Sequence, residues 1–197
     1  MQIARNLAIA IIVLVSLTAQ QCNAGQPTSP DANTSAKPEK AAAMNFNIVE
    51  KDAFTVMGIQ TRITSTDQKN PETYTKIWDA FEQYRAQVRP LSIEQRSFGV
   101  TFATDKKDVF DYLAGVSVHS DAAKPDPNLV TRNIPAARYA VFKCASQDMG
   151  KTYQSIYSEW LPGSRYKIDA AACCFEQYAP KEWANRPVYI SIPIVPK

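Results

Sequence analysis

The sequence has a single histidine, His119, no Cys-x-x-Cys pair and no concentrated block of Lys and Arg. Metal sites need several His, Cys or carboxylate ligands at short spacings, so we expect neither a metal nor a cofactor such as haem, which wants an axial histidine. The net charge of +3 is spread along the chain. Nucleic acids and anionic membranes both attract concentrated basic patches, so we also expect no nucleic-acid partner and no polybasic membrane contact.

The motifs of nucleophilic catalysis are also missing. There is no Gly-x-Ser-x-Gly sequence, and no second histidine that could activate a cysteine. Gly58, Gly99 and Gly115 stand alone within strand-like segments, which indicates bulges or close packing and not a phosphate-binding loop. These absences favour binding over catalysis.

The longest apolar run is too short to cross a membrane. Arg5 precedes the run of residues 7–17 (LAIAIIVLVSL), whereas a helix that spans a bilayer core needs about 20 residues. Cys22-Asn23-Ala24 follows, with small residues at the first and third of these positions. This layout predicts a secretory signal peptide over residues 1–24, cut after Ala24, and therefore an exported protein, periplasmic or secreted.

Two alternatives to cleavage stay open. The apolar run could be retained as an anchor, or Cys22 could carry a lipid. A lipobox has an aliphatic residue three positions before the cysteine and a small residue directly before it. Ala19 and Gln21 stand there instead, which disfavours a lipoprotein.

The next segment, residues 25–44, is rich in Pro, Ser, Thr and Ala and contains no aromatic residue. Such a segment cannot bury enough apolar surface to offset its ordering entropy, so we expect a disordered linker. The folded domain is expected over residues 45–197.

Removal of the signal would leave three cysteines, Cys144, Cys173 and Cys174, an odd number for an oxidising compartment. Cys144 could pair with either of the others. A bond between Cys173 and Cys174 would need a strained turn, because neighbouring residues of a strand point to opposite faces. Three reduced, buried thiols are equally compatible with the pattern.

A strand–helix–strand–strand pattern occurs twice in the domain. The strand-like segments are residues 46–50, 54–64, 98–103 and 109–118 in the first copy, and 129–134, 137–144, 171–178 and 188–194 in the second. A helix should run from Asn70 to Pro90, with Tyr74, Ile77, Trp78, Phe81, Tyr84 and Val88 on one face. A second helix is expected over residues 149–160, with Tyr153, Ile156, Tyr157 and Trp160 on one face. The two units predict an α+β fold, a sheet with helices on one face and a groove at the junction.

Glu176 is the one acidic residue within an otherwise apolar and aromatic strand segment. Strand geometry places Cys174, Glu176 and Tyr178 on one face, and Cys173, Phe175 and Gln177 on the other. If Phe175 packs toward the helices, Glu176 points to the opposite, concave side. A buried carboxylate is costly unless it is paired or protonated, which suggests a site for a cation. The alternative is a glutamate on an edge strand that faces water.

Aromatic residues are abundant, with nine Tyr, eight Phe and three Trp. A carboxylate beside aromatic rings suits a flat cationic ligand, because charge pairing and cation–π attraction act together. Tyr112 and Trp160 are the candidates for the pocket wall, with Tyr178 beside Glu176 on its strand; both wall residues would otherwise belong to the core. His119 follows a strand at the edge of a polar loop, where exposure is expected.

Eight short strings together resemble a known family: FTVMGIQTR, IWDAF, SFGVTF, FDYLAGVSV, IPAARYAVF, W-LPGS, FEQY and VYISIPI. Their order and spacing are similar to those of GyrI-like domains, the effector-binding domains of AraC- and MerR-type regulators, over about residues 45–196. The resemblance implies two βαββ units about a pseudo-twofold axis, an antiparallel sheet and a central ligand groove. It also implies that Glu176 lies in that groove and meets cationic or amphipathic aromatic compounds.

The signal and linker stand where such regulators carry a helix-turn-helix region, so a one-component transcription factor is not expected. Some stand-alone relatives imply an alternative function, the hydrolysis of small electrophilic compounds. Glu176 would then act as a general base, and Tyr112 or Tyr178 would polarise the substrate. An envelope protein-interaction module is a further alternative. The fold is also similar to that of SOUL-type haem-binding proteins, although His119 is poorly placed as an axial ligand.

Overall fold

The computed structural model describes residues 44–180 and 186–197. The predicted signal peptide and all of the predicted linker except Met44 lie outside the described residues. Of the helices that the structure describes, none has both the length and the apolar character to span a membrane.

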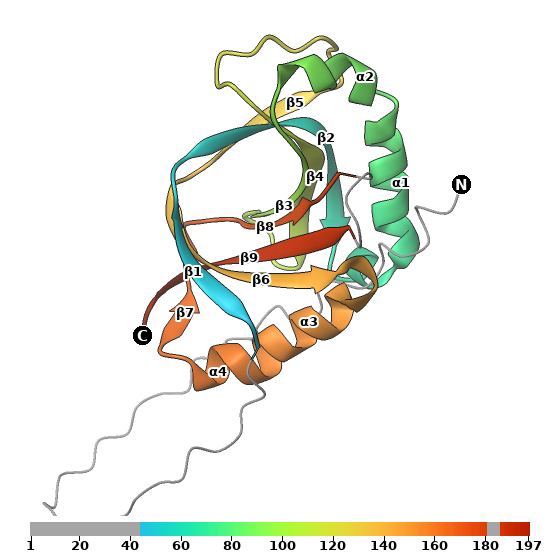
Figure 1. Cartoon of the computed structure of the whole chain (residues 1–197). Helices are drawn as coiled ribbons and strands as arrows, with labels where there is room; N and C mark the ends of the chain where they lie inside the picture. Colours follow the sequence, from blue (N-terminus) through green and yellow to red (C-terminus); the bar gives the residue numbers. More distant parts are fainter. Residues whose placement is uncertain (1–43, 181–185) are drawn as a thin grey trace, which may run out of the picture.

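One curled, antiparallel sheet forms the centre of the domain (Figure 1). Its main path runs in the order β1-β6-β9-β8-β3-β4-β2-β5, and β7 pairs with β9. The strands are β1 (Phe46–Lys51), β2 (Phe54–Thr64), β3 (Ser92–Ala103), β4 (Val109–Val118), β5 (Val130–Ile134), β6 (Ala137–Ala145), β7 (Tyr166–Ile168), β8 (Cys174–Tyr178) and β9 (Pro187–Pro196).

The two ends of this path meet because residues 46–58 of the β1–β2 segment pair with residues 130–142 of the β5–β6 segment. β1 and β2 follow one another directly, as do β5 and β6, and Lys51 faces Ala137 while Phe54 faces Ile134. The register therefore continues unchanged across the break, where Pro135 lacks the N–H that a ladder needs. The sheet consequently closes on itself into the ring seen in Figure 1.

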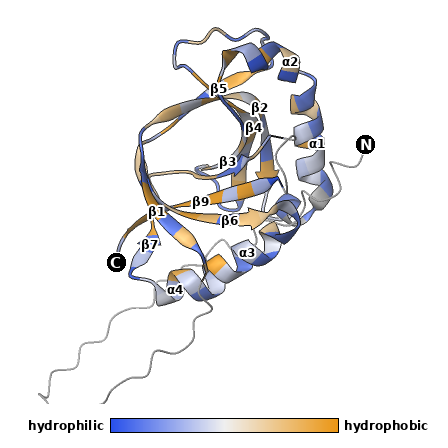
Figure 2. Ribbon diagram, in the orientation of Figure 1, coloured by the Kyte–Doolittle hydropathy of each residue, from blue (hydrophilic) through white to orange (hydrophobic). Residues whose placement is uncertain are grey.

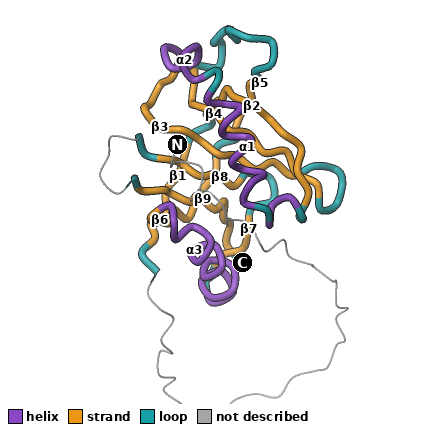
Figure 3. The backbone as a smooth tube through the Cα atoms, turned by 90° about the vertical axis from the view of Figure 1, so that its right-hand side faces the viewer, coloured by secondary structure: helices purple, strands orange, loops and turns teal. Residues whose placement is uncertain are grey.

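The two predicted units are confirmed. β1–β2, β3 and β4 with helix α1 (Pro71–Glu82) correspond to β5–β6, β8 and β9 with helix α3 (Met149–Ser155). The central pair is β3 with β8, one strand from each unit. Both helices lie on the same outer side of the sheet, as the turned view in Figure 3 shows. The short strand β7 was not predicted.

Both helices are shorter than their apolar patterns predicted. Asn70 caps α1 by accepting a hydrogen bond from the Glu72 N–H (3.0 Å), but α1 ends at Glu82, and a separate turn, α2 (Arg85–Val88), leads to Pro90. The Tyr84 N–H bonds to the Phe81 carbonyl there, which closes the turn. α3 continues as a π-helical turn, η5 (Ile156–Trp160), and then α4 (Leu161–Gly163). Single-turn 3₁₀ segments are η2 (Asp67–Lys69), η3 (Arg89–Leu91) and η4 (Ser146–Asp148).

Three buried apolar clusters hold the fold together, and apolar residues concentrate on the strands (Figure 2). One lies between α1 and the sheet, and a second between α3, η5 and the sheet. The third fills the inside of the curled sheet and includes Phe98, Tyr139 and Phe175. Each central strand therefore has a helix-facing side and an inner side, and this division positions the site.

The predicted close packing at the isolated glycines is confirmed. Gly58 of β2 lies opposite Gly115 of β4. A Cβ atom at Gly58 would lie 1.9 Å from the Ala114 carbonyl oxygen, and one at Gly115 would lie 2.3 Å from the Met57 carbonyl oxygen. Side chains at these positions would push the two strands apart.

Candidate functional site

Glu176 lies at the centre of the sheet, on β8, directly opposite Gly99 of β3. It is only 3% exposed. The predicted division of the strand into two faces is confirmed, but the expected orientation was wrong. Phe175 packs inside the curled sheet, and Glu176 faces the helices. The Phe175 ring packs inside the curled sheet, where it contacts the rings of Phe98 and Tyr139.

One carboxylate oxygen of Glu176 is held by a short hydrogen bond. The Tyr153 hydroxyl, on α3, donates to Oε1 at 2.5 Å. The other oxygen, Oε2, has no well-formed hydrogen bond among the described residues, although the Tyr112 hydroxyl lies close enough to favour the ionised form weakly. The carboxylate is therefore half satisfied.

Gly99 is what allows Tyr112 to reach the carboxylate. Tyr112 belongs to β4, and β3 separates it from β8. A Cβ atom at Gly99 would lie 2.1 Å from the Tyr112 hydroxyl oxygen and 2.6 Å from Glu176 Oε2. The Tyr112 ring thus leans across β3 through the space that the glycine leaves, and this approach places the two polar groups side by side.

Aromatic residues from both helices complete a shell around Glu176. Tyr74, on α1, packs edge-on against Tyr112 with ring centroids 5.0 Å apart, and Trp78 packs against Tyr178 at the same distance. Tyr153 stacks with Tyr157 of η5. We define the aromatic shell as Tyr74, Trp78, Tyr112, Tyr153, Tyr157 and Tyr178.

Burial dominates the electrostatics of the shell. Desolvation raises the pKa of Glu176 to about 7, and the hydrogen bond from Tyr153 only partly counteracts it. Desolvation also raises the pKa of the phenols of Tyr112, Tyr153 and Tyr178, and the nearby Glu176 charge adds to each shift. Among the described side chains, the ion pairs involve other carboxylates, those of Glu50, Glu82 and Asp111. Within residues 44–180 and 186–197, Glu176 takes part in none of these ion pairs.

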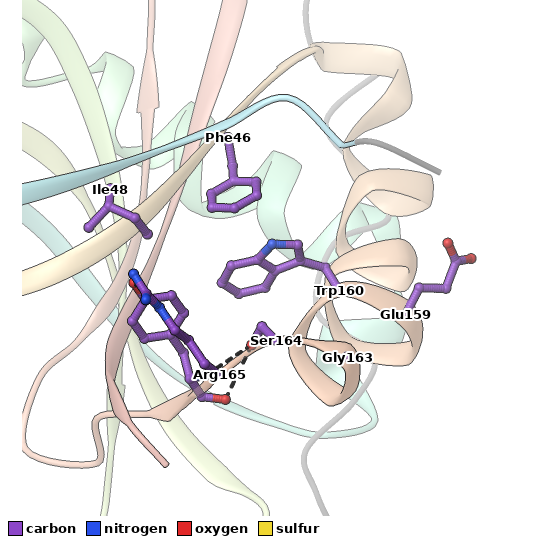
Figure 4. A pocket seen from close by; sticks show the side chains of 8 residues that line it. Phe46, Ile48, Glu159, Trp160, Gly163, Ser164 and Arg165 are labelled. Atoms are coloured by element: carbon purple, nitrogen blue, oxygen red, sulfur yellow. Dashed lines mark hydrogen bonds between the residues drawn. The ribbon is translucent and has the colours of Figure 1, made fainter. Parts of the chain in front are cut away.

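The structure brings three of the four residues predicted for the site together. Tyr112 and Tyr178 surround Glu176, whereas Trp160 lies at the end of η5, against Phe46 and Phe142. Trp160 lines a separate, mainly apolar surface pocket of about 440 Å³ with Phe46, Ile48, Glu159, Gly163, Ser164, Arg165 and Tyr166 (Figure 4). The role of Trp160 in ligand binding stays a prediction, and it concerns this surface pocket and not the surroundings of Glu176.

Four residues of the shell were not predicted as site residues. Tyr74 and Trp78 on the first helix, and Tyr153 and Tyr157 on the second, were assigned only to the helix faces that pack on the sheet. A signal was present, since each helix carries a tyrosine followed four residues later by a second aromatic residue. The two pairs occupy corresponding places in the two units, and both approach the junction.

The described cysteines are free. Cys173 and Cys174 point to opposite faces of the sheet, as expected, because they pack in different clusters. Burial raises the pKa of Cys174 to about 12, and its Sγ lies 4.0 Å from the Tyr157 hydroxyl oxygen. His119 is exposed. Within residues 44–180 and 186–197, no group of three or more His, Cys, Asp or Glu could hold a metal ion.

The fold is shared with several solved structures. An integron cassette protein from Vibrio cholerae is 22% identical, with a TM-score of 0.51 over 76% of this chain and 95% of that one. A protein bound to tetraphenylphosphonium is 14% identical, with a TM-score of 0.60 over 77% of this chain and 94% of that one. The C-terminal domain of EcmrR is 13% identical, with a TM-score of 0.58 over 79% of this chain and 99% of that one.

No curated protein matches the sequence significantly. A family profile, in contrast, matches residues 47–194, which is almost the whole described domain. It describes integron-associated effector-binding proteins, in agreement with the GyrI-like resemblance of the sequence. With both βαββ units inside the matched region, the chain belongs to the Cass2 family of integron-associated effector-binding proteins.

Proposed function

We propose that this protein binds small cationic or amphipathic aromatic molecules, with Glu176 as the counter-charge and the aromatic shell as the wall. The observation that carries the proposal is a buried carboxylate that lies among aromatic side chains and takes part in no ion pair of the described residues. A buried charge is retained at a cost, and a cationic ligand would remove that cost.

The chemistry of the shell supports this ligand class. Tyrosine and tryptophan rings present negative faces that attract cations, and they also bury apolar surface. The solved structure that contains tetraphenylphosphonium has the same fold, which is consistent with a bulky aromatic cation at such a site. Because Tyr112 and Tyr153 are at most 2% exposed, a ligand must displace part of the shell to reach Glu176. Trp78, Tyr157 and Tyr178 are the partly exposed residues of the shell.

The proposal is tested by titrating the domain that begins at Gly25 with tetraphenylphosphonium and with rhodamine-type cationic dyes, using calorimetry. Glu176→Gln should weaken binding at least about tenfold, because the ligand charge then loses its buried partner. The affinity of the wild type for a permanently charged cation should rise as the pH increases from 6 to 8, since the carboxyl with a pKa of about 7 then ionises before binding.

Glu159→Gln is the matched control. Glu159 is an exposed carboxylate that lines the separate pocket next to Trp160. Its removal should leave the affinity unchanged if the dye binds at Glu176. Equal affinity of wild type and Glu176→Gln for every cation tested would refute the proposed function.

We further propose that the protein acts after export. The support is the sequence of residues 1–24, with its short apolar run and small residues before the expected cleavage site. Expression of the full chain in a Gram-negative host should release a mature protein that begins at Gly25, as determined by intact mass. A species with the mass of the full chain, or one lipidated at Cys22, would contradict this expectation.

A further inference from the structure

Three buried polar atoms around the site lack a well-formed hydrogen bond among the described residues, although the Tyr112 hydroxyl lies close to one of them. They are Glu176 Oε2, the Tyr74 hydroxyl and Trp78 Nε1. Nearly all buried polar groups in folded proteins are paired, and an unpaired one destabilises the fold. Nine such atoms occur among the described residues, and three of them belong to Glu176 and the aromatic shell.

These atoms differ in what they need from a partner. Glu176 Oε2 is an acceptor once ionised and requires a donor. Trp78 Nε1 is only a donor, and the Tyr74 hydroxyl, which lies within electrostatic reach of Glu176, is a donor as well. The Trp78 ring in turn packs on Tyr178, two residues beyond Glu176 on the same face of β8. Glu176 and the aromatic shell thus hold one acceptor and two donors without a well-formed hydrogen bond.

On the basis of the function proposed above, we propose that the preferred ligands are protonated amines or amidines that also carry a hydrogen-bond acceptor. The N–H group of such a cation would donate to Glu176 Oε2. An ether, carbonyl or ring-nitrogen acceptor elsewhere on the ligand would receive the Tyr74 and Trp78 donors. Quaternary ammonium and phosphonium cations satisfy the charge of Glu176 but cannot donate to Oε2, and those without an acceptor also leave the Tyr74 and Trp78 donors unpaired.

The ring contacts of the aromatic shell bear on the shape of the preferred ligand. Tyr74 and Tyr112 meet edge-on, as do Trp78 and Tyr178, so a flat aromatic ligand that displaces one ring of a pair would meet the face or edge of the other. The two donors both come from α1, whereas the carboxylate comes from β8 and is held from α3 through Tyr153. The acceptor of the ligand should therefore point toward α1, on the opposite side of the carboxylate from α3.

Three matched probes test this inference on the domain that begins at Gly25. The parent is a methoxynaphthyl-ethylammonium cation, the second is its N-trimethyl counterpart, and the third replaces the ether oxygen by a methylene group. The parent should bind about five- to tenfold more tightly than either of the others, as expected for a buried hydrogen bond lost in each case. Equal affinity of the three probes for the wild type would overturn the inference.

Tyr74→Phe and Trp78→Phe locate the acceptor contact. Each should reduce the preference for the parent over the methylene probe, and each should leave the preference over the N-trimethyl probe unchanged. A uniform loss for all three probes would contradict the assigned hydrogen bonds. Glu176→Gln should weaken the binding of all three probes. This variant separates the two proposals. If the wild type binds the three probes equally and Glu176→Gln weakens them equally, the proposed function stands and only the preference for protonated amines with an acceptor is rejected.

Discussion

Glu176→Gln should be more stable than the wild type by about 3 kcal/mol at pH 8, and the two proteins should be nearly equal in stability at pH 4. The carboxyl of Glu176 is almost fully buried, and desolvation raises its pKa from the ordinary value of 4.5 to about 7 in the folded protein. Each pKa unit corresponds to about 1.4 kcal/mol of differential stability between the protonation states.

The sign follows from proton binding. Between pH 4.5 and 7 the folded state holds a proton on Glu176 that the unfolded state has released, so the free energy of unfolding falls as the pH rises. The stabilisation from the neutral carboxyl is complete below pH 4.5 and is lost as the pH passes through about 7. The glutamine side chain stays neutral at every pH, so the Glu176→Gln variant keeps this stabilisation.

Urea unfolding of wild type and variant across this pH range measures the effect. Other carboxylates titrate in both proteins, so the difference between the two curves isolates Glu176. Glu159→Gln should follow the wild-type curve at every pH, because Glu159 is exposed. A constant difference between Glu176→Gln and the wild type from pH 4 to pH 8 would show that the carboxyl is not held neutral. A stabilised variant that has lost cation binding would also indicate that the carboxylate is kept for function at the expense of stability.

Much of the fold follows from local patterns in the sequence. The alternation of side chains along β8 placed Cys174, Glu176 and Tyr178 on one face, and the helical spacing of Tyr74, Ile77 and Phe81 placed them against the sheet. Both predictions need only the periodicity of one element. The duplicated unit also follows from the sequence, since the order of strands and helices repeats.

The side of the sheet that Glu176 faces could not be predicted in the same way. Periodicity defines two faces but does not tell which one meets the helices, and the concave position of Glu176 depended on the assumption that Phe175 packs toward them. The curled sheet has a second apolar interior of its own, and Phe54, Phe98 and Tyr139 provide ring partners for Phe175 inside it. Sheet curvature depends on pairing between distant segments, which no single element encodes.

The sequence also did not predict which helix residues would reach Glu176, because this too depends on contacts beyond a single element. Trp160 and Tyr157 are only three residues apart and were expected on one helix face, but the chain forms a π-helical turn there and the two side chains reach different places. Tyr153 was assigned to the core by its spacing, and the core position is correct. What the spacing could not show is that its hydroxyl would extend beyond the apolar contacts to Glu176.

Gly99→Ala should destabilise the domain by about 1–3 kcal/mol and should also weaken cation binding. Alanine is normally more favourable than glycine within a strand, so intrinsic preference predicts a small gain in stability. Here the added Cβ would lie 2.1 Å from the Tyr112 hydroxyl oxygen and 2.9 Å from Tyr112 Cζ, and these atoms are buried. Tyr112 would have to leave the carboxylate, and its ring contact with Tyr74 would change with it.

Urea unfolding at pH 6 and dye titration measure the two effects, and Gly163→Ala is the matched control. No atom lies within 4 Å of a Cβ at Gly163, so this variant should keep the stability and affinity of the wild type. The Gly99→Ala result also tests how the two units build one site. If Gly99, from the first unit, controls the surroundings of Glu176, from the second, then stability and affinity fall together. Wild-type values for both would mean that Tyr112 can be displaced at little cost, and that the approach across β3 is not what positions the carboxylate.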